Sequence, residues 1–245
     1  MKLKSLLMLL FFLGLILSLM AKLGQEKRDI ITLSYSEIER RVLVDAGHGG
    51  YDPGANYRGM IEKDVALELA KKVKEELEEI NIEVVMTRED DSLLREDCLF
   101  KDLQARARLG KEENVDLLLS LHVNNYPSSL CFGGQVFYHH SSEKSSHLAE
   151  AIQEELRKIQ PDNTRQIAPC SSLYLLKALE VPSVLIEAGF IKNKVDRERL
   201  TSEEGQREIA LAIRRGVHLF YNQNLGKWPP PVEASGQKHG FLSPQ

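Results

Sequence analysis

The sequence predicts a single three-layer α/β domain, in which a largely parallel sheet is covered by helices on both faces. Short apolar runs alternate with longer amphipathic stretches, and repeated β–α alternation is typical of parallel sheets. The composition is 42% hydrophobic and 28% charged, as in ordinary globular proteins. The length of 245 residues lies just below the roughly 250–300 residues at which a single core usually divides.

Five apolar runs predict the buried strands of this sheet. They are residues 41–46 (RVLVDA), 82–86 (IEVVM), 115–121 (VDLLLSL), 134–139 (GQVFYH) and 183–188 (SVLIEA). Helices are expected between them. Over residues 63–80 the apolar side chains recur every three or four positions, at Val65, Leu69, Val73, Leu77 and Ile80, which indicates a helix with one buried face. Further helices are expected at residues 102–113, 143–159 and 203–221.

The two ends of the chain differ from this domain. Residues 6–21 follow Lys2 and Lys4 and contain only Ser18 as a polar residue, which is typical of an export signal or a membrane anchor. A small-x-small cleavage site is poorly matched, which favours an anchor, and a cleaved signal stays the alternative. We assign residues 1–21 to this segment, 22–40 to a linker, 41–222 to the domain and 223–245 to a flexible tail.

The segment predicts export across the cytoplasmic membrane, with membrane contact only through residues 1–21. The net charge of −4, without a basic stripe, argues against a nucleic-acid partner, because such binding normally needs clustered Lys and Arg. Cys98, Cys131 and Cys170 show no CxxC pattern, so they indicate neither a structural zinc site nor a redox motif. At most one disulfide is possible, and three thiols are the simpler interpretation.

Polar side chains follow three of the predicted strands. His48 lies within GHGG after the first strand, His122 follows the third, and Glu187 lies in the fifth. The carboxyl ends of parallel strands meet at one edge of a sheet, where active residues gather. Glu62 stands at the entry to the predicted 63–80 helix. Two imidazoles and a carboxylate are a set that catalytic zinc uses, with a fourth position left for water.

Each of these residues also has an ordinary structural interpretation. A strand-end histidine can simply be hydrogen bonded, and Glu62 would be favourable at a helix N-terminus without any ligand. Glu187 emerges from a strongly apolar strand that would raise its proton affinity toward neutral pH, which suits a general base. The alternative is an ion pair of Glu187 with Lys192 or Arg88.

Five separated motifs carry a resemblance to a known family. They are DAGHGGYDPGA (45–55), GMIEKD (59–64), MTRED (86–90), SLHVN (120–124) and PSVLIEAGFIKN (182–193). Residues 41–222 resemble the zinc-dependent N-acetylmuramoyl-L-alanine amidases, the type-3 amidase family of bacterial cell-wall hydrolases. The resemblance implies that His48, Glu62 and His122 hold Zn²⁺ and that Glu187 is catalytic. Ala46 departs from the proline that the family often has there, and it touches no expected ligand.

The resemblance implies a peptidoglycan substrate and hydrolysis of the amide between N-acetylmuramic acid and the L-alanine of the stem peptide. Asn124 and Arg88 fit substrate-contacting positions, although a turn-stabilising role for Asn124 and an ion pair for Arg88 stay open. A zinc carboxypeptidase acting on the stem peptide and a non-catalytic wall-binding relative are the alternative functions.

The run of residues 163–190, together with the N-terminal segment, resembles the spore-cortex amidases that act in germination. In that subgroup, removal of the stem peptide allows a second enzyme to form the muramic δ-lactam. Such an enzyme would act at the forespore or cortex. Some relatives depend on an accessory protein, so a protein partner stays open.

Overall fold

The computed structural model describes residues 14, 18, 20 and 40–224. Most of the predicted signal or anchor (1–21), nearly all of the linker (22–40) and residues 225–245 of the predicted tail therefore lie outside the described residues. Within the described part of the chain, no helix is long and apolar enough to cross a membrane.

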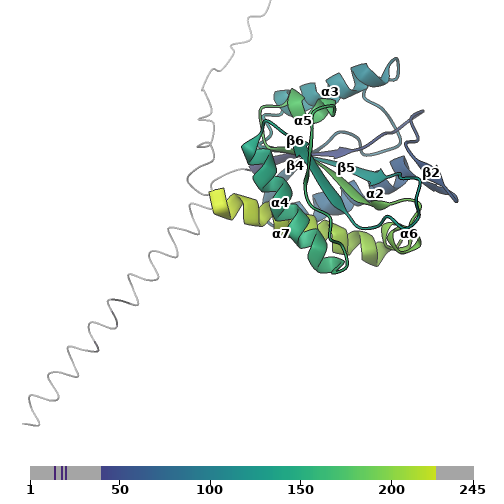
Figure 1. The fold of residues 1–245 in the computed structure, drawn as a ribbon. Helices are drawn as coiled ribbons and strands as arrows, with labels where there is room; N and C mark the ends of the chain where they lie inside the picture. Colours follow the sequence, from purple (N-terminus) through teal and green to yellow (C-terminus); the bar gives the residue numbers. More distant parts are fainter. Residues whose placement is uncertain (1–13, 15–17, 19, 21–39, 225–245) are drawn as a thin grey trace, which may run out of the picture. The chain divides into compact units, whose positions relative to one another are not determined.

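A six-stranded sheet forms the middle layer of the domain, with the strand order β4-β1-β5-β8-β6-β7 (Figure 1). Four of the five neighbouring strand pairs are parallel, and β6 runs antiparallel to β8. The predicted largely parallel sheet is therefore confirmed. The strands are β1 (Arg40–Ala46), β4 (Ile82–Met86), β5 (Leu117–Asn124), β6 (Gln135–His139), β7 (Ala168–Cys170) and β8 (Ser183–Phe190).

Helices cover both faces of the sheet (Figure 1). One face is covered by α2 (Glu62–Glu78), α4 (Glu143–Ile159) and α7 (Glu203–Asn224). The other face is covered by α3 (Leu99–Glu112) and α5 (Tyr174–Ala178). Side chains alternate across each strand, so Val42 and Val44 of β1 join the larger core beneath α2 and α7, whereas Leu43 joins the smaller core beneath α3. The predicted three-layer domain is confirmed.

The structure contains five short elements that the sequence patterns did not predict. A hairpin of β2 (Asn56–Tyr57) and β3 (Met60–Ile61) precedes α2, and α6 (Lys194–Thr201) follows β8. The other two are β7 and α5. At two to eight residues, these elements are too short for a hydrophobic period to develop. The predicted strands 115–121 and 183–188 end later than expected, at Asn124 and Phe190, which places His122 inside β5.

Two of the helices that cover the larger core pack closely where α7 crosses α4. A Cβ atom at Gly216 of α7 would lie 2.6 Å from the Cα of Ile152 in α4. Both residues are buried, and Phe220 lies one turn further along α7 in the same core. The absence of a side chain at Gly216 therefore sets how closely these two helices approach.

We predict that Gly216→Ala destabilises the domain. Helix propensity alone would favour alanine by about 1 kcal/mol, but the added methyl group meets main chain, and overpacking of this kind typically costs about 1–3 kcal/mol. Urea denaturation measures the net effect. His218→Ala, on the exposed side of the same helix, is the control and should change stability by less than about 0.5 kcal/mol. An alanine variant more stable than the parent would contradict the close packing.

Candidate active site

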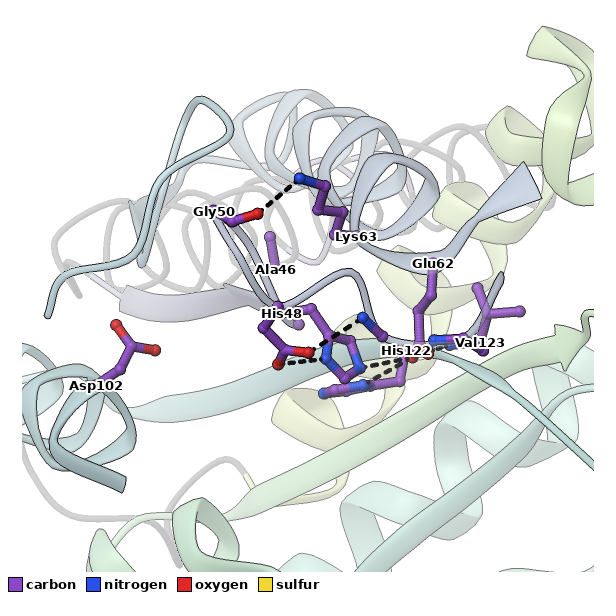
Figure 2. Close-up of polar contacts among 12 residues, drawn as sticks. Ala46, His48, Gly50, Glu62, Lys63, Asp102, His122 and Val123 are labelled. Atoms are coloured by element: carbon purple, nitrogen blue, oxygen red, sulfur yellow. Dashed lines mark hydrogen bonds and ion pairs between the residues drawn. The ribbon is translucent and has the colours of Figure 1, made fainter. Parts of the chain in front are cut away.

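His48, Glu62 and His122 converge beside the carboxyl ends of β1 and β5 (Figure 2). The Glu62 Oε1 atom lies 3.1 Å from His48 Nε2 and 3.0 Å from His122 Nδ1. One potential ligand atom from each residue lies within 4.8 Å of the others. The three residues come from a loop, a helix start and a strand, and the structure brings them together as the sequence analysis expected.

Glycines make room for the two imidazole rings. A Cβ atom at Gly47 would overlap the ring of His122, and one at Gly54 would lie 2.6 Å from His48 Cδ2. His48 itself has a φ of 61°, a left-handed conformation that is uncommon for a residue with a side chain. The main chain at Gly47 therefore lies directly against the ring of His122, and the main chain at Gly54 lies directly against the ring of His48, with no room for a side chain at either glycine.

The Glu62 carboxylate is buried and held in its charged form. Its side chain lies at the first position of α2, and the residue is 5% exposed. Oε1 also accepts a hydrogen bond from Val123 N at 3.0 Å, and Oε2 accepts one from Ala55 N at 2.8 Å. Burial acts to raise the pKa of Glu62, but hydrogen bonds and charge from His122 and His48 outweigh it and lower that pKa. An ionised carboxylate facing two imidazoles is a donor set that suits a divalent cation.

Asp52 fixes the orientation of His48. The Asp52 Oδ2 atom lies 2.8 Å from His48 Nδ1, which leaves Nε2 directed at Glu62. Burial acts to lower the pKa of His48, but Glu62 and Asp52 together raise it to about 9. A carboxylate behind an imidazole in this way is the usual support of a metal-ligating histidine. Sequence reasoning did not assign Asp52 a role, although it lies four residues after His48 in the first motif.

Two buried arginines hold the main chain of residues 46–48. Arg88 donates to the carbonyl oxygens of Ala46 at 2.9 Å and Gly47 at 2.8 Å. Arg106 donates to the carbonyl oxygens of Ala46 at 2.8 Å and His48 at 2.7 Å. Arg88 and Arg106 are 4% and 3% exposed. Together they restrain the loop that presents His48.

Arg106 is also the centre of a buried charge network. It contacts Asp45 Oδ1 at 2.8 Å and Asp102 Oδ2 at 2.6 Å. Asp45 further accepts hydrogen bonds from Thr87 and Ser120. Burial acts to raise the pKa of Asp45, but Arg106, with help from Ser120 and His122, outweighs it and lowers that pKa. The network secures the end of β1 directly beneath the site.

The substrate contacts expected for Arg88 and Asn124 stay predictions. The nitrogen atoms of Arg88 donate to main-chain oxygens, including those of Lys63 and Asp90, so this side chain supports the loop. Asn124 is half-buried at the end of β5, and its carbonyl oxygen accepts a hydrogen bond from Ile191 N at 2.9 Å.

Glu187 lies beside His122 in the sheet, because the two are paired in the register of β5 and β8. Its Oε2 atom is buried without a hydrogen-bond partner among the described residues. In that part of the chain Glu187 forms no ion pair with Arg88 or Lys192, which were the alternative partners. Burial, aided by Glu62 and opposed by the histidines, raises the pKa of Glu187 to about 7. Such a carboxyl group can exchange a proton near neutral pH.

A cavity of about 260 Å³ opens beside His48 and His122. Its walls are largely apolar and come from α3 and α5, with Leu103 and Leu176 among them. Asp45 also lines it, at the end of β1. The cavity therefore gives access to the two histidines from this side of the sheet.

A sheet that carries a His–Glu–His cluster and a buried, unpaired glutamate at its strand ends is typical of a hydrolase. The model of the family described as N-acetylmuramoyl-L-alanine amidase matches residues 42–218. The chain therefore belongs to the N-acetylmuramoyl-L-alanine amidase family, as the five motifs indicated. Enzymes of this family hydrolyse the amide between N-acetylmuramic acid and the L-alanine of the stem peptide in peptidoglycan.

Individual relatives agree with this assignment. The germination-specific N-acetylmuramoyl-L-alanine amidase of Bacillus subtilis is 32% identical over 197 residues, which are 78% of this chain and 82% of that protein. The solved structure of the CwlD amidase from Clostridioides difficile, in complex with the GerS lipoprotein, is 35% identical with a TM-score of 0.73. It covers 76% of this chain and 100% of that chain. LytC, an amidase of Bacillus subtilis, is 32% identical over 74% of this chain and 35% of its own length.

We predict that Arg106→Met lowers the free energy of unfolding by about 3–5 kcal/mol, because removing one partner leaves buried Asp45 and Asp102 without their countercharge. Chemical denaturation measures this loss. Arg108→Met is the matched control on the same helix. Its side chain is 70% exposed, so the change should stay within about 0.5 kcal/mol. Equal, small losses in both variants would show that the buried network does not stabilise the domain.

Proposed function

We propose that this amidase is zinc-dependent, that His48, Glu62 and His122 hold the metal, and that Glu187 is the catalytic base. The observation that carries the proposal is a single arrangement. A charged carboxylate lies between two imidazoles, and an unpaired carboxyl group with a pKa near neutral lies on the adjacent strand. The donor set matches catalytic zinc sites, which use three protein ligands of these types.

Zinc held by these three residues supplies Lewis-acid polarisation of the scissile carbonyl group and acidification of the attacking water. The chain's own residues perform the remaining steps. Asp52 Oδ2 accepts a hydrogen bond from Nδ1–H of His48 and so keeps Nε2 available as a ligand atom. Arg88 and Arg106 hold the main chain of this loop in place, which keeps the ligand atoms preorganised.

Glu187 moves the proton. Its Oε2 atom takes a proton from the attacking water as the carbon–oxygen bond forms, and it then delivers that proton to the departing amine nitrogen of L-alanine as the carbon–nitrogen bond breaks. A carboxylate with an ordinary pKa would be a poorer proton acceptor at neutral pH. Burial in β8, which raises the pKa of Glu187 to about 7, therefore suits both halves of this role.

We further propose that the enzyme is exported and acts on the spore cortex. Similarity to the germination-specific amidase of Bacillus subtilis supports this. The Clostridioides difficile relative was solved with a lipoprotein, which makes an accessory protein a candidate partner of this chain as well. Membrane contact through residues 1–21 stays part of the proposal and lies outside the described residues.

Mass spectrometry of digested spore cortex or cell wall tests the cleaved bond and the metal together. We expect two products: free peptides whose first residue is L-alanine, and glycan whose muramic acid residues lack a peptide. Chelation should abolish the products, and added Zn²⁺ should restore them. Shortened stem peptides that remain attached to the sugar would instead identify a carboxypeptidase. Undiminished turnover in protein shown to be metal-free would overturn the zinc dependence.

Glu187→Gln tests the base. Loss of general-base catalysis should lower kcat by about 10²–10⁴-fold, whereas the bound zinc, measured by elemental analysis, should stay at the parent level. Glu180→Gln is the control, because Glu180 is exposed and lies just before β8. A Glu187→Gln enzyme with parental kcat would show that another group accepts the proton.

A further inference from the structure

A second groove lies beside the hairpin that leads into α2. It encloses about 520 Å³ between the turn of the β2–β3 hairpin and helix α6. Its lining contains three cations and one acid: Arg58, Arg197 and Lys194, together with Glu198. Lys194 lies 3.7 Å from Glu198, and both of these side chains are largely exposed. The groove therefore carries a net positive charge.

Arg58 occupies a backbone position that suits its side chain poorly. Tyr57 pairs with Met60 across the hairpin, so Arg58 and Gly59 form a two-residue turn with φ values of 52° and 84°. Turns with two positive φ values strongly prefer Asn-Gly, since asparagine tolerates the left-handed region better than most residues. Neither the turn nor the core requires an arginine here, because Arg58 is exposed.

The positive charge of Arg58 is not paired with any acid in the part of the chain that the structure describes. Among the described residues it forms no ion pair, and its guanidinium group lies 5.5 Å from the ring of Tyr57. Arg197 approaches the same ring at 5.2 Å. Its Nη1 atom donates to the carbonyl oxygens of Ile191 and Lys192, which fixes the guanidinium group at the groove. Two arginines thus gather around one aromatic ring.

Another groove lined by cations lies at α3 and the segment before it, and its cations, unlike Arg58, are paired with acids. Arg95 and Lys101 each form an ion pair with Asp97, at 3.2 and 2.8 Å. Arg108 lies 3.5 Å from Glu112. The cations of the α3 groove are therefore already paired within the domain, whereas Arg58 is available to an anionic ligand.

The groove lies within reach of the candidate active site. Arg58 precedes Glu62 by four residues, so their Cα atoms are at most about 14 Å apart. Helix α6 follows β8, the strand that contains Glu187. An extended peptide advances about 3.3 Å per residue, so a carboxylate two to four residues from the scissile bond lies about 7–13 Å from it. The separation between Arg58 and Glu62 is therefore of the same order as the separation between such a carboxylate and the scissile bond.

We propose that this groove binds carboxylate groups of the stem peptide, with Arg58 and Arg197 as the recognising cations. Guanidinium groups suit this task because they can donate two parallel hydrogen bonds to one carboxylate. The inference rests on the proposed function and specifies the peptide side of its substrate. It makes the enzyme selective for stem peptides that carry free carboxylates.

The test compares two muramoyl-peptide substrates, one with free carboxylates and one with the same groups amidated. Arg58→Asn should raise KM for the acidic substrate about tenfold, as expected for loss of one charge-assisted interaction, with little change in kcat. KM for the amidated substrate should be unchanged. Thermal unfolding should show equal or higher stability, because Asn-Gly suits the turn. Arg108→Gln, which removes an equal charge from α3, should leave both KM values at the parent level.

Three results would count against the groove. Equal KM values of the parent enzyme for the two substrates, with no effect of Arg58→Asn, would overturn the inference while leaving the proposed function intact. An equal rise in KM for both substrates would show that Arg58 does not recognise the carboxylate and would overturn the inference; Arg58→Gly, which also suits this turn, would then show the same equal rise. Failure of the parent enzyme to cleave either substrate would overturn the proposed function and the inference with it.

Discussion

The site depends on two buried guanidinium groups that donate hydrogen bonds to the main chain of residues 46–48. Arg88 and Arg106 donate to three consecutive carbonyl oxygens, and Arg106 is itself neutralised by Asp45 and Asp102. His48 can hold its left-handed conformation because the surrounding hydrogen bonds leave the loop little freedom. The position of one imidazole therefore depends on charged side chains that hold the loop from beneath.

Two glutamates at the site differ in their protonation because their surroundings differ. Glu62 accepts hydrogen bonds from main-chain amides and faces two imidazoles, so it stays ionised. Glu187 has a buried oxygen without a partner, and its pKa is raised to about 7. Environments that separate the pKa values of nearby carboxyl groups are a general sign of divided roles. Here the two environments fit the proposed roles of Glu62 as a metal ligand and Glu187 as a base.

Much of this arrangement could be predicted from sequence. The apolar runs gave the parallel strands, and their polar ends gave His48, His122 and Glu187, because parallel strands bring their carboxyl ends to one edge. Glu62 could be assigned to the same candidate site because it stands at the start of a predicted helix. The positions of these residues could be predicted because a residue type and its place in an element together limit the possible chemistry, and their roles stay proposals.

Other features depend on contacts between distant segments and were missed for that reason. Arg88 was expected to contact substrate or to form an ion pair, and the substrate contact stays a prediction, but nothing in the MTRED motif indicates that Arg88 also donates to the carbonyl oxygens of Ala46 and Gly47, more than 40 positions earlier. Asp52 and Arg106 lie in segments that were otherwise interpreted correctly, yet their roles follow only from side-chain packing. The β2–β3 hairpin was too short to show a period, although the Arg58-Gly59 pair offered a turn signal.

The pairing of His122 with Glu187 across β5 and β8 has an evolutionary consequence. The proposed metal ligand His122 and the proposed base Glu187 are spaced by the hydrogen-bond ladder of the central sheet, not by the loops around it. Loops tolerate insertions better than strands do, so changes in the surrounding loops can alter which polymers or proteins bind without changing the spacing of these two residues.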